Sequence, residues 1–594
     1  MTLGSDSIES QFNISRSNSN QQSTYVFESF SLDAGRLMLY RDGNEVEFAP
    51  KVVETLLALI EKRGTIVSKD EMFSRVWKNS FVDPSNLTQN IYLLRKALGC
   101  SMASGKAFIE TFRGRGYRFN GEVEEIVGSA VKSQIDHSLA VLPFKNESAD
   151  VNAEYLSDGI TESIISRLSQ LDQLRVVARG TAFRYKGQNV VPGDVGRELG
   201  VNSILTGRVL QLGDSLIVRA ELVETATGWQ LWGKQYDSRD SDILGLQETI
   251  AKEISENLQL KLNGEDRRRL SKRFTESTDA YHLYIKGRYY LHKRRTESIK
   301  KAADFFQQAI GIDPTYALAW VGLSDCYPLL TLYGEWTPSR AYPHARSAVK
   351  KALEIDDRLS EAYNALGVVS LFYEWDWNGA EKAFRTAIEL NPGRPDAHQR
   401  YGMLLTILKR FDEAELELRL AQELDPLSLI TKTIGGYPFY YARDYPRAGK
   451  RFQEVLAMDP DYSMAHFRLG LTYAHQKEYD AAISELQAAQ NISNDRDTVA
   501  ALGYVQGLAG NLDEAQAAVA VIAEREKVGY VSAYDRFLLY LGLGDQETAL
   551  DWLERAVEER SYWLIYLNVD PALDPVRSHS RFEAIAKKVF PASL

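Results

Sequence analysis

The sequence predicts a multidomain chain of mixed class: a small α+β module, a small α/β domain and then an all-α solenoid. Three observations predict this order. Alternating apolar and polar residues open the chain, buried-strand and amphipathic-helix patterns follow in its middle, and alanine pairs seven residues apart recur in its second half. The length of 594 residues suits several domains rather than one.

Composition narrows the class of protein. A net charge of -11 argues against a protein that coats nucleic acid along its whole length, but it leaves room for one basic module. Cys100 and Cys326 lie far apart and indicate neither a disulfide framework nor a zinc cluster. The amino-terminal residues lack the features of a secretory signal, and no apolar run approaches the roughly 18–20 residues that span a bilayer. We therefore expect a cytoplasmic protein without a membrane partner.

The first module, residues 25–120, follows a polar leader at residues 1–24 that we expect to be disordered. Its opening runs alternate apolar and polar residues around Asp42-Gly43, a hairpin-turn signal, and predict a small antiparallel sheet. A helix is expected from about Pro50 until Gly64. The sequence S-K-D-E at Ser68–Glu71 forms a capping box that opens a second helix.

A third helix is predicted over Pro84–Leu98, with Asp83 as its cap. At 3.6 residues per turn one narrow stripe is apolar, and it consists of Leu87, Ile91, Leu94 and Leu98. The opposite side and its flank carry Ser85, Thr88, Gln89, Tyr92, Arg95 and Lys96. A helix with an apolar back and a hydrogen-bonding face that ends in positive charge suits a DNA groove. An ordinary amphipathic surface helix is the alternative.

The module ends with AFIETFRGRGYRF, two extended runs separated by glycines. This order of elements resembles the winged-helix DNA-binding domain of the OmpR/PhoB-type response regulators, in the variant without a receiver domain that occurs in CadC-, ToxR- and HilA-like regulators. Two motifs carry the resemblance: Val82-Asp83 followed by Leu94-Arg95-Lys96-Ala97-Leu98, and TFRGRGYRF at Thr111–Phe119, which matches the family's T-x-R-G-x-G-Y-R-F wing.

In that family the third helix enters the major groove and the wing reaches the neighbouring minor groove. The resemblance implies that Arg95 contacts the DNA backbone and that Arg113 enters the minor groove. It implies contacts to bases or phosphates for Ser85, Thr88, Gln89 and Tyr92. Residues 84–120 hold six basic groups against Glu110 alone, and Lys96 and Arg115 belong to this DNA-binding set. Because one helix and one wing cover only a short half-site, a homodimer or tandem binding is expected.

Several residues of the module have a second interpretation. Tyr117 and Phe119 are expected in the core of the wing rather than stacked on bases, and Trp77 is expected in the core. Arg118 alternates with them and could pair with an acid. Leu93 departs from the family, where this position is often basic, and it could contact thymine methyls or pack on a partner.

A linker is predicted at residues 121–137 and an α/β domain at residues 138–262. The domain begins with a buried strand, SLAVLPF, continues with a helix that has Leu156 and Ile160 on one side, and ends in a three-strand meander and a helix. The patterns LAVLPF, Leu156-Ser157-Asp158-Gly159, ILTGRV and LWGKQYD resemble the TolB-amino-terminal-like domain. The domain contains no Walker A loop and no dinucleotide fingerprint.

Residues 275–594 contain eight units of a tetratricopeptide pattern, spaced mostly by 33 to 35 residues, and a carboxyl-terminal cap. The second unit carries an aromatic insertion in which Tyr333, Trp336 and Tyr342 pack in the solenoid or line a ligand pocket. Stacked repeats form a superhelix whose groove is expected to bind a protein or peptide.

The sequence thus predicts a sequence-specific DNA-binding transcriptional regulator whose repeats sense or dock a protein or ligand partner. RNA polymerase is a further expected partner. The alternative is a cytoplasmic interaction scaffold in which the winged helix binds protein. An enzyme is not expected, because no HExxH, GxSxG or P-loop motif is present. The eight histidines lack metal-ligand spacing, and we expect neither a metal nor a cofactor.

Overall fold

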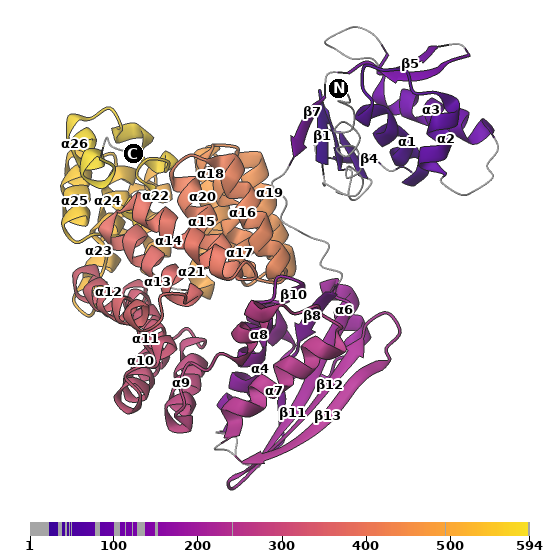
Figure 1. Cartoon of the computed structure of the whole chain (residues 1–594). Coiled ribbons are helices and arrows are strands. Elements are labelled where there is room, and N and C mark those ends of the chain that lie inside the picture. Colours follow the sequence, from indigo (N-terminus) through magenta and orange to yellow (C-terminus); the bar gives the residue numbers. More distant parts are fainter. Residues whose placement is uncertain are drawn as a thin grey trace, which may run out of the picture. The chain divides into compact units, whose positions relative to one another are not determined.

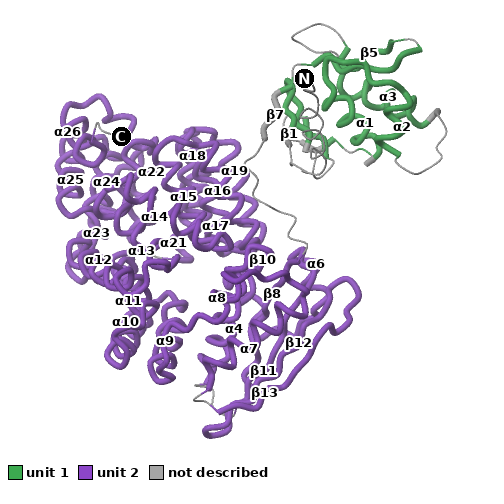
Figure 2. The backbone as a smooth tube through the Cα atoms, viewed as in Figure 1, with its two compact units in different colours: residues 1–134 green, residues 135–594 purple. Residues whose placement is uncertain are grey.

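The chain forms two compact units, residues 1–134 and residues 135–594, in the computed structural model (Figure 2). The structure describes residues 23–33, 38–41, 44–46, 48, 50–77, 84–99, 107–112, 114–121, 123–127, 137–148, 153–239, 242–493 and 495–591. None of the helices in this part of the chain combines the length and apolar character needed to cross a bilayer.

The first unit opens with an antiparallel sheet in the order β4-β3-β2-β1-β7. Its strands are β1 (Ser23–Phe27), β2 (Phe30–Asp33), β3 (Met38–Arg41), β4 (Asn44–Val46) and β7 (Glu124–Val127). Strands β3 and β4 pair Arg41 with Asn44, which confirms the expected hairpin, although Asp42 and Gly43 lie outside the described residues. Strand β7 lies inside the stretch predicted as linker. It pairs along β1 and covers the edge that β1 would otherwise expose.

Three helices and a hairpin complete the unit: α1 (Pro50–Glu61), α2 (Lys69–Val76), α3 (Pro84–Leu98), β5 (Ile109–Phe112) and β6 (Gly116–Phe119). Ser68 caps α2 by accepting the Glu71 N–H, as the capping-box pattern predicts. The apolar stripe of α3 is buried as expected, and Asp83 lies outside the described residues. Four phenylalanine rings, 5.2 to 6.1 Å apart, join sheet and hairpin in one core: Phe27, Phe30, Phe108 and Phe119.

The second unit begins with a sheet in the order β10-β8-β11-β12-β13, in which β8 is parallel to β10 and β11, and β11 to β13 form the predicted meander. Its strands are β8 (His137–Val141), β9 (Lys145–Asn146), β10 (Leu174–Val176), β11 (Ser203–Leu212), β12 (Ser215–Glu224) and β13 (Gln230–Arg239). Its helices are α4 (Glu154–Leu168), α5 (Arg179–Ala182), η2 (Phe183–Tyr185), α6 (Pro192–Leu199), α7 (Ile243–Asn257) and α8 (Gly264–Ser271). Leu156, Ile160 and Ile164 on α4 are fully buried, as their spacing predicts.

Paired helices then build the repeat array (Figure 1). The pairs in the described residues are α9 (Thr278–Leu291) with α10 (Thr296–Ile312), α11 (Ala317–Leu332) with α12 (Pro338–Ile355), α13 (Ser360–Val369) and η4 (Ser370–Glu374) with α14 (Trp377–Leu390), α15 (Pro395–Ile407) with α16 (Phe411–Leu424), α17 (Leu429–Ile434) and α18 (Tyr437–Tyr441) with α19 (Tyr445–Met458), α20 (Ser463–His475) with α21 (Tyr479–Ile492), α22 (Arg496–Leu508) with α23 (Leu512–Glu526), and α24 (Ala533–Gly542) with α25 (Gln546–Glu558). The alanine pairs of the sequence pattern lie on the second helix in six of the eight helix pairs and are fully buried. In the other two, on α19 and α23, the second position is Val455 or Ile522, also fully buried. The small alanine side chains let neighbouring helices approach closely.

The array closes on itself between its second and seventh units. Arg496 on α22 donates to the carbonyl oxygens of Thr331 and Leu332 at 3.1 and 2.8 Å, and the Tyr530 N–H donates to Gly334 O at 2.9 Å. The repeats therefore complete about one superhelical turn. The aromatic residues of the insertion in the second unit differ in burial. Tyr342 is buried and stacks on Tyr373, and Trp336 is partly buried against Tyr327, whereas Tyr333 is 40% exposed.

The carboxyl-terminal segment comprises η5 (Tyr562–Tyr566), η6 (Pro571–Val576) and α26 (Ser580–Val589). It packs against the first helices of several units: Tyr562 stacks on Phe372 at 4.9 Å, and Tyr566 stacks on Tyr441 at 4.9 Å. The expected cap thus also fills part of the inner surface of the array. At these units the predicted peptide groove is occupied by the chain's own aromatic residues.

Candidate nucleic-acid interface

Helix α3 is held against α1 by one buried polar side chain as well as by its apolar stripe. Asn90 donates to Lys51 O at 3.0 Å and to Thr55 Oγ1 at 2.9 Å, and it is 8% exposed. Since a buried amide must find partners, these bonds fix both the position and the rotation of α3. The side chains opposite the stripe therefore have a defined direction.

The exposed face of α3 carries most of the residues expected to contact DNA. Thr88, Gln89 and Lys96 are exposed, and Tyr92 is 60% exposed, which is unusual for a large ring. The side chain of Ser85 lies outside the described residues. Leu93 is half-buried and packs against the core of the unit, so its departure from the family pattern has a structural explanation.

The wing is anchored to the loop between α1 and α2. Val67 and Tyr117 exchange two backbone hydrogen bonds of 2.8 and 2.9 Å. Gly116 lies at φ +137°, where a Cβ would stand 2.0 Å from Val67 O, so this close approach requires glycine. The Arg115 N–H donates to Phe112 O at 2.9 Å and closes the tight turn of the wing.

The basic residues of the wing divide into two groups. Arg118 pairs with Glu110 at 2.8 Å and lies over the ring of Phe112, as its alternative interpretation anticipated. Tyr117 and Phe119 are buried in the core, as expected. Arg115 is exposed, and Arg113 lies outside the described residues. Arg115 and Lys96 thus offer positive charge to a polyanion on this unit, whereas Arg118 is neutralised.

Arg95 links α3 to the wing. Its Nε donates to Ile109 O at 3.0 Å, and its Nη2 donates to Thr111 Oγ1 at 2.6 Å. The structure thus bonds this guanidinium to strand β5, and the contact from Arg95 to the DNA backbone that the resemblance implies stays a prediction. Sequence reasoning missed the link because nothing in the spacing of Arg95 and Thr111 indicates that they meet.

Comparisons with known proteins match this architecture domain by domain. The family of transcriptional regulatory protein C-terminal domains matches residues 43–119, which include α3 and the wing. The second domain of HilA/YgeH-like transcriptional regulators matches residues 135–262, and the tetratricopeptide repeat matches residues 368–428 and 436–497. The chain thus combines an OmpR/PhoB-type winged-helix domain, a HilA-like second domain and tetratricopeptide repeats, and in this it is similar to the CadC/HilA-like regulators. The domain expected to be TolB-amino-terminal-like is therefore matched by the HilA-like second domain.

Individual relatives agree with this assignment. The transcriptional regulator HilA of Salmonella typhimurium is 26% identical over 410 residues, which cover 68% of this chain and 70% of that protein. The transcriptional activator CadC of Escherichia coli is 32% identical over 78 residues, 13% of this chain and 15% of CadC. The "Putative adenylate cyclase 3" of Rhizobium meliloti is 30% identical over 287 residues, which cover 47% of this chain and only 42% of that relative.

Proposed function

We propose that this regulator binds DNA sequence-specifically, with α3 in the major groove and the wing in the adjacent minor groove. The observation that carries the proposal is the rigid connection of these two elements. Arg95 fixes β5 to α3, and the bridge at Val67 and Tyr117 fixes β6 to the helical core. A preformed pair of reading elements needs little ordering when it binds, which favours affinity.

The proposed contacts divide by chemistry. Gln89 has the amide that pairs with adenine in the major groove, and Thr88 and Tyr92 flank it with hydroxyl groups. Lys96 and Arg115 contact phosphates, which supply the salt-dependent part of the affinity. Ser85 and Arg113 are proposed on sequence grounds, at the start of α3 and in the minor groove. Arg95 is proposed as a positioning residue rather than as a phosphate contact.

A mobility-shift titration of the full chain at several salt concentrations, on a duplex selected from a random pool, tests this assignment. Arg115→Ala is expected to weaken binding to all sequences and to reduce the slope of log K against log salt by about 1. Gln89→Ala is instead expected to relax the preference for one base at a single position of the duplex. Lys382 is an exposed lysine of the repeat array, and Lys382→Ala is the matched control. This variant is expected to leave both the salt dependence and the base preference unchanged. Equal behaviour of all three variants contradicts the assignment.

The repeat array is proposed to dock a protein that conveys the signal, and RNA polymerase and a second copy of the chain are further proposed partners. Because the carboxyl-terminal segment fills the inner surface at several units, the docking surface is proposed elsewhere on the array. The alternative is a scaffold in which the winged helix binds protein. A partner that competes with DNA for α3 would favour the scaffold.

We also propose that the chain acts in the cytoplasm and has no enzyme activity. The matched families are the transcriptional regulatory protein C-terminal domain, the second domain of HilA/YgeH-like transcriptional regulators and the tetratricopeptide repeat. The cyclase-named relative resembles less than half of the chain. Incubation of the full chain with ATP and a divalent metal is expected to yield no cyclic AMP, and formation of cyclic AMP would contradict this proposal.

A further inference from the structure

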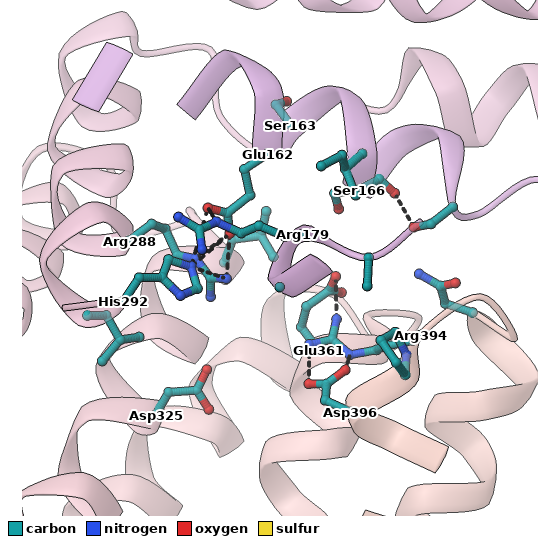
Figure 3. Close-up of a pocket in the computed structure, with 18 of the residues that line it drawn as sticks. Glu162, Ser163, Ser166, Arg179, Arg288, His292, Asp325, Glu361, Arg394 and Asp396 are labelled. Atoms are coloured by element: carbon teal, nitrogen blue, oxygen red, sulfur yellow. Dashed lines mark hydrogen bonds and ion pairs between the residues drawn. The ribbon is translucent and has the colours of Figure 1, made fainter. Parts of the chain in front are cut away.

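The second unit contains a cavity of about 560 Å³ where the HilA-like domain meets the repeat array (Figure 3). Helices α4, α5 and α7 form one side of it, and α9, α11, α13, α15 and α17 form the other. This volume falls within the range of sites that enclose small molecules. The residues that meet here are up to 272 positions apart in the chain, from Gly159 to Thr431, so the cavity exists only when the domain and the repeats pack together.

The cavity is positively charged, although the whole chain is acidic. Eight arginines and five carboxylates line it, which gives the wall a formal charge of +3. The arginines are Arg167, Arg179, Arg269, Arg273, Arg288, Arg294, Arg394 and Arg400. The carboxylates are Glu162, Asp325, Glu361, Asp396 and Asp425. An excess of guanidinium groups on a concave wall attracts anions.

Two clusters of the wall are satisfied by their own ion pairs. On α4, Glu162 accepts from Arg288 at 2.5 Å and from Arg179 at 3.1 Å (Figure 3). Burial alone would raise the pKa of Glu162, but the charges of Arg288, His292 and Arg179 hold it well below its usual range. These bonds join the middle domain to the first repeat helix.

The second cluster joins neighbouring repeats. Arg394 pairs with Glu361 and with Asp396, each at 2.8 Å. Burial acts to lower the pKa of Arg394, but the carboxylates of Asp396 and Glu361 outweigh it. The pKa is therefore raised above its usual value, and the group stays charged. The charges of both clusters are therefore balanced by their own ion pairs, and they serve as charged walls of the cavity.

Arg400 and Arg294 differ from these clusters. Among the residues that the structure describes, neither guanidinium has a carboxylate within 4.0 Å or a hydrogen-bond acceptor. Arg400 on α15 is half-buried, and Arg294 lies at the exposed end of the α9–α10 loop. Burial lowers the pKa of Arg294, and the nearby positive charge of Arg400 lowers it further, whereas Tyr333 and Asp325 raise it. Asp325 lines the same cavity, and its charge acts on both arginines. One carboxylate leaves an excess of positive charge beside two guanidinium groups, and an added anion would offset it.

Apolar side chains complete the cavity. Leu291 of α9, Leu329 of α11 and Val368 of α13 contribute aliphatic surface, and Tyr284 and Tyr316 contribute rings. A ligand for this wall therefore carries an apolar body as well as a negative group. The planar fork of arginine matches a carboxylate with two parallel hydrogen bonds.

We propose that this cavity binds a small organic carboxylate, with its carboxylate on Arg400 and Arg294 and its apolar body against Leu329, Tyr284 and Tyr316. Binding there would join α9, α11 and α15 of the repeat array, because the five named residues lie on or next to these helices. The inference deepens the proposed sensing role of the array, but it is tested without DNA. Loss of DNA binding and loss of carboxylate binding are therefore separate outcomes.

The probe is benzoate at millimolar concentration, with benzamide as its uncharged isostere, and the readout is the melting temperature and calorimetric binding of the full chain. Benzoate is expected to bind and stabilise the parent, and benzamide is not. Arg400→Gln is expected to weaken benzoate binding by about tenfold or more, since it removes a charge-assisted hydrogen-bond pair. Arg294→Gln is expected to weaken it less, because Arg294 is exposed.

Arg419→Gln on α16, an exposed arginine outside the cavity, is the matched control and is expected to bind benzoate like the parent. The charge of Arg400 acts on the buried carboxylates of Asp325 and Asp396, so Arg400→Gln is expected to melt somewhat below the parent, and its benzoate binding is measured by calorimetry at a temperature at which the variant is folded. Absence of benzoate binding to the parent overturns the proposal. Equal binding of benzoate and benzamide, or of benzoate to Arg400→Gln and the parent, also overturns it.

Discussion

Replacement of Arg95 by alanine tests whether α3 and the wing act as one reading element. The change removes the hydrogen bonds from the guanidinium to Ile109 O and Thr111 Oγ1. A hydrogen bond from a charged group contributes about 1.5–3 kcal/mol, and partial exposure of Arg95 places the pair near the lower end. We expect a loss of about 2 kcal/mol in the free energy of unfolding of the first unit. For a domain of this size the melting temperature would fall by roughly 8–16 °C.

The assay uses a fragment of residues 20–134, which retains strand β7, with melting followed by circular dichroism and duplex binding measured against salt. Thr111→Val keeps the bond to Ile109 O and is expected to show a smaller loss. As a positioning residue, Arg95 should lower affinity on replacement without changing the salt slope. An unchanged melting temperature together with a slope reduced by about 0.9 would mean that Arg95 contacts a phosphate instead, which refutes the reasoning.

Three further predictions concern other parts of the chain. Gly116→Ala forces a Cβ against Val67 O and is expected to lower the melting temperature of the first unit more than Gly64→Ala does. Gly64 also has a positive φ, but the space around it is open. Burial and the charge of Arg179 lower the pKa of His292 to about 3. Because only the unfolded chain takes up this proton, stability is lost as pH falls from about 6.5 towards 3, and His292→Gln should flatten this part of the curve of melting temperature against pH. Tyr566→Ala removes a buried ring and is expected to destabilise the repeat array by about 3–5 kcal/mol in urea unfolding, and a loss below 1 kcal/mol would show that η5 does not support the array.

Local patterns predicted most of the fold. The stripe from Leu87 to Leu98 and the alanine pairs such as Ala414 and Ala421 are repeated at fixed spacing, and each member is buried where the spacing places it. Such periodicity records which face of one element is covered. It needs no knowledge of the covering element, which is why it can be read from sequence.

Contacts between distant segments could not be predicted in the same way. Strand β7 pairs with β1 across about 100 residues, and its four residues carry too little pattern to distinguish a strand from a linker. Arg95 and Glu162 are charged residues on amphipathic helices, where a solvated side chain is the usual outcome. Their actual partners follow from tertiary packing, and so does the cavity around Arg400.

One comparison tests the central claim most directly: competition of a selected duplex against heparin for the full chain, with the double variant Gln89→Ala, Tyr92→Ala beside the parent. If an oriented helix and wing read the grooves, the parent is expected to keep the duplex at heparin concentrations that displace the duplex from the double variant. If the parent leaves the duplex as readily as the variant does, only its charge has been recognised, and the assigned reading face is wrong.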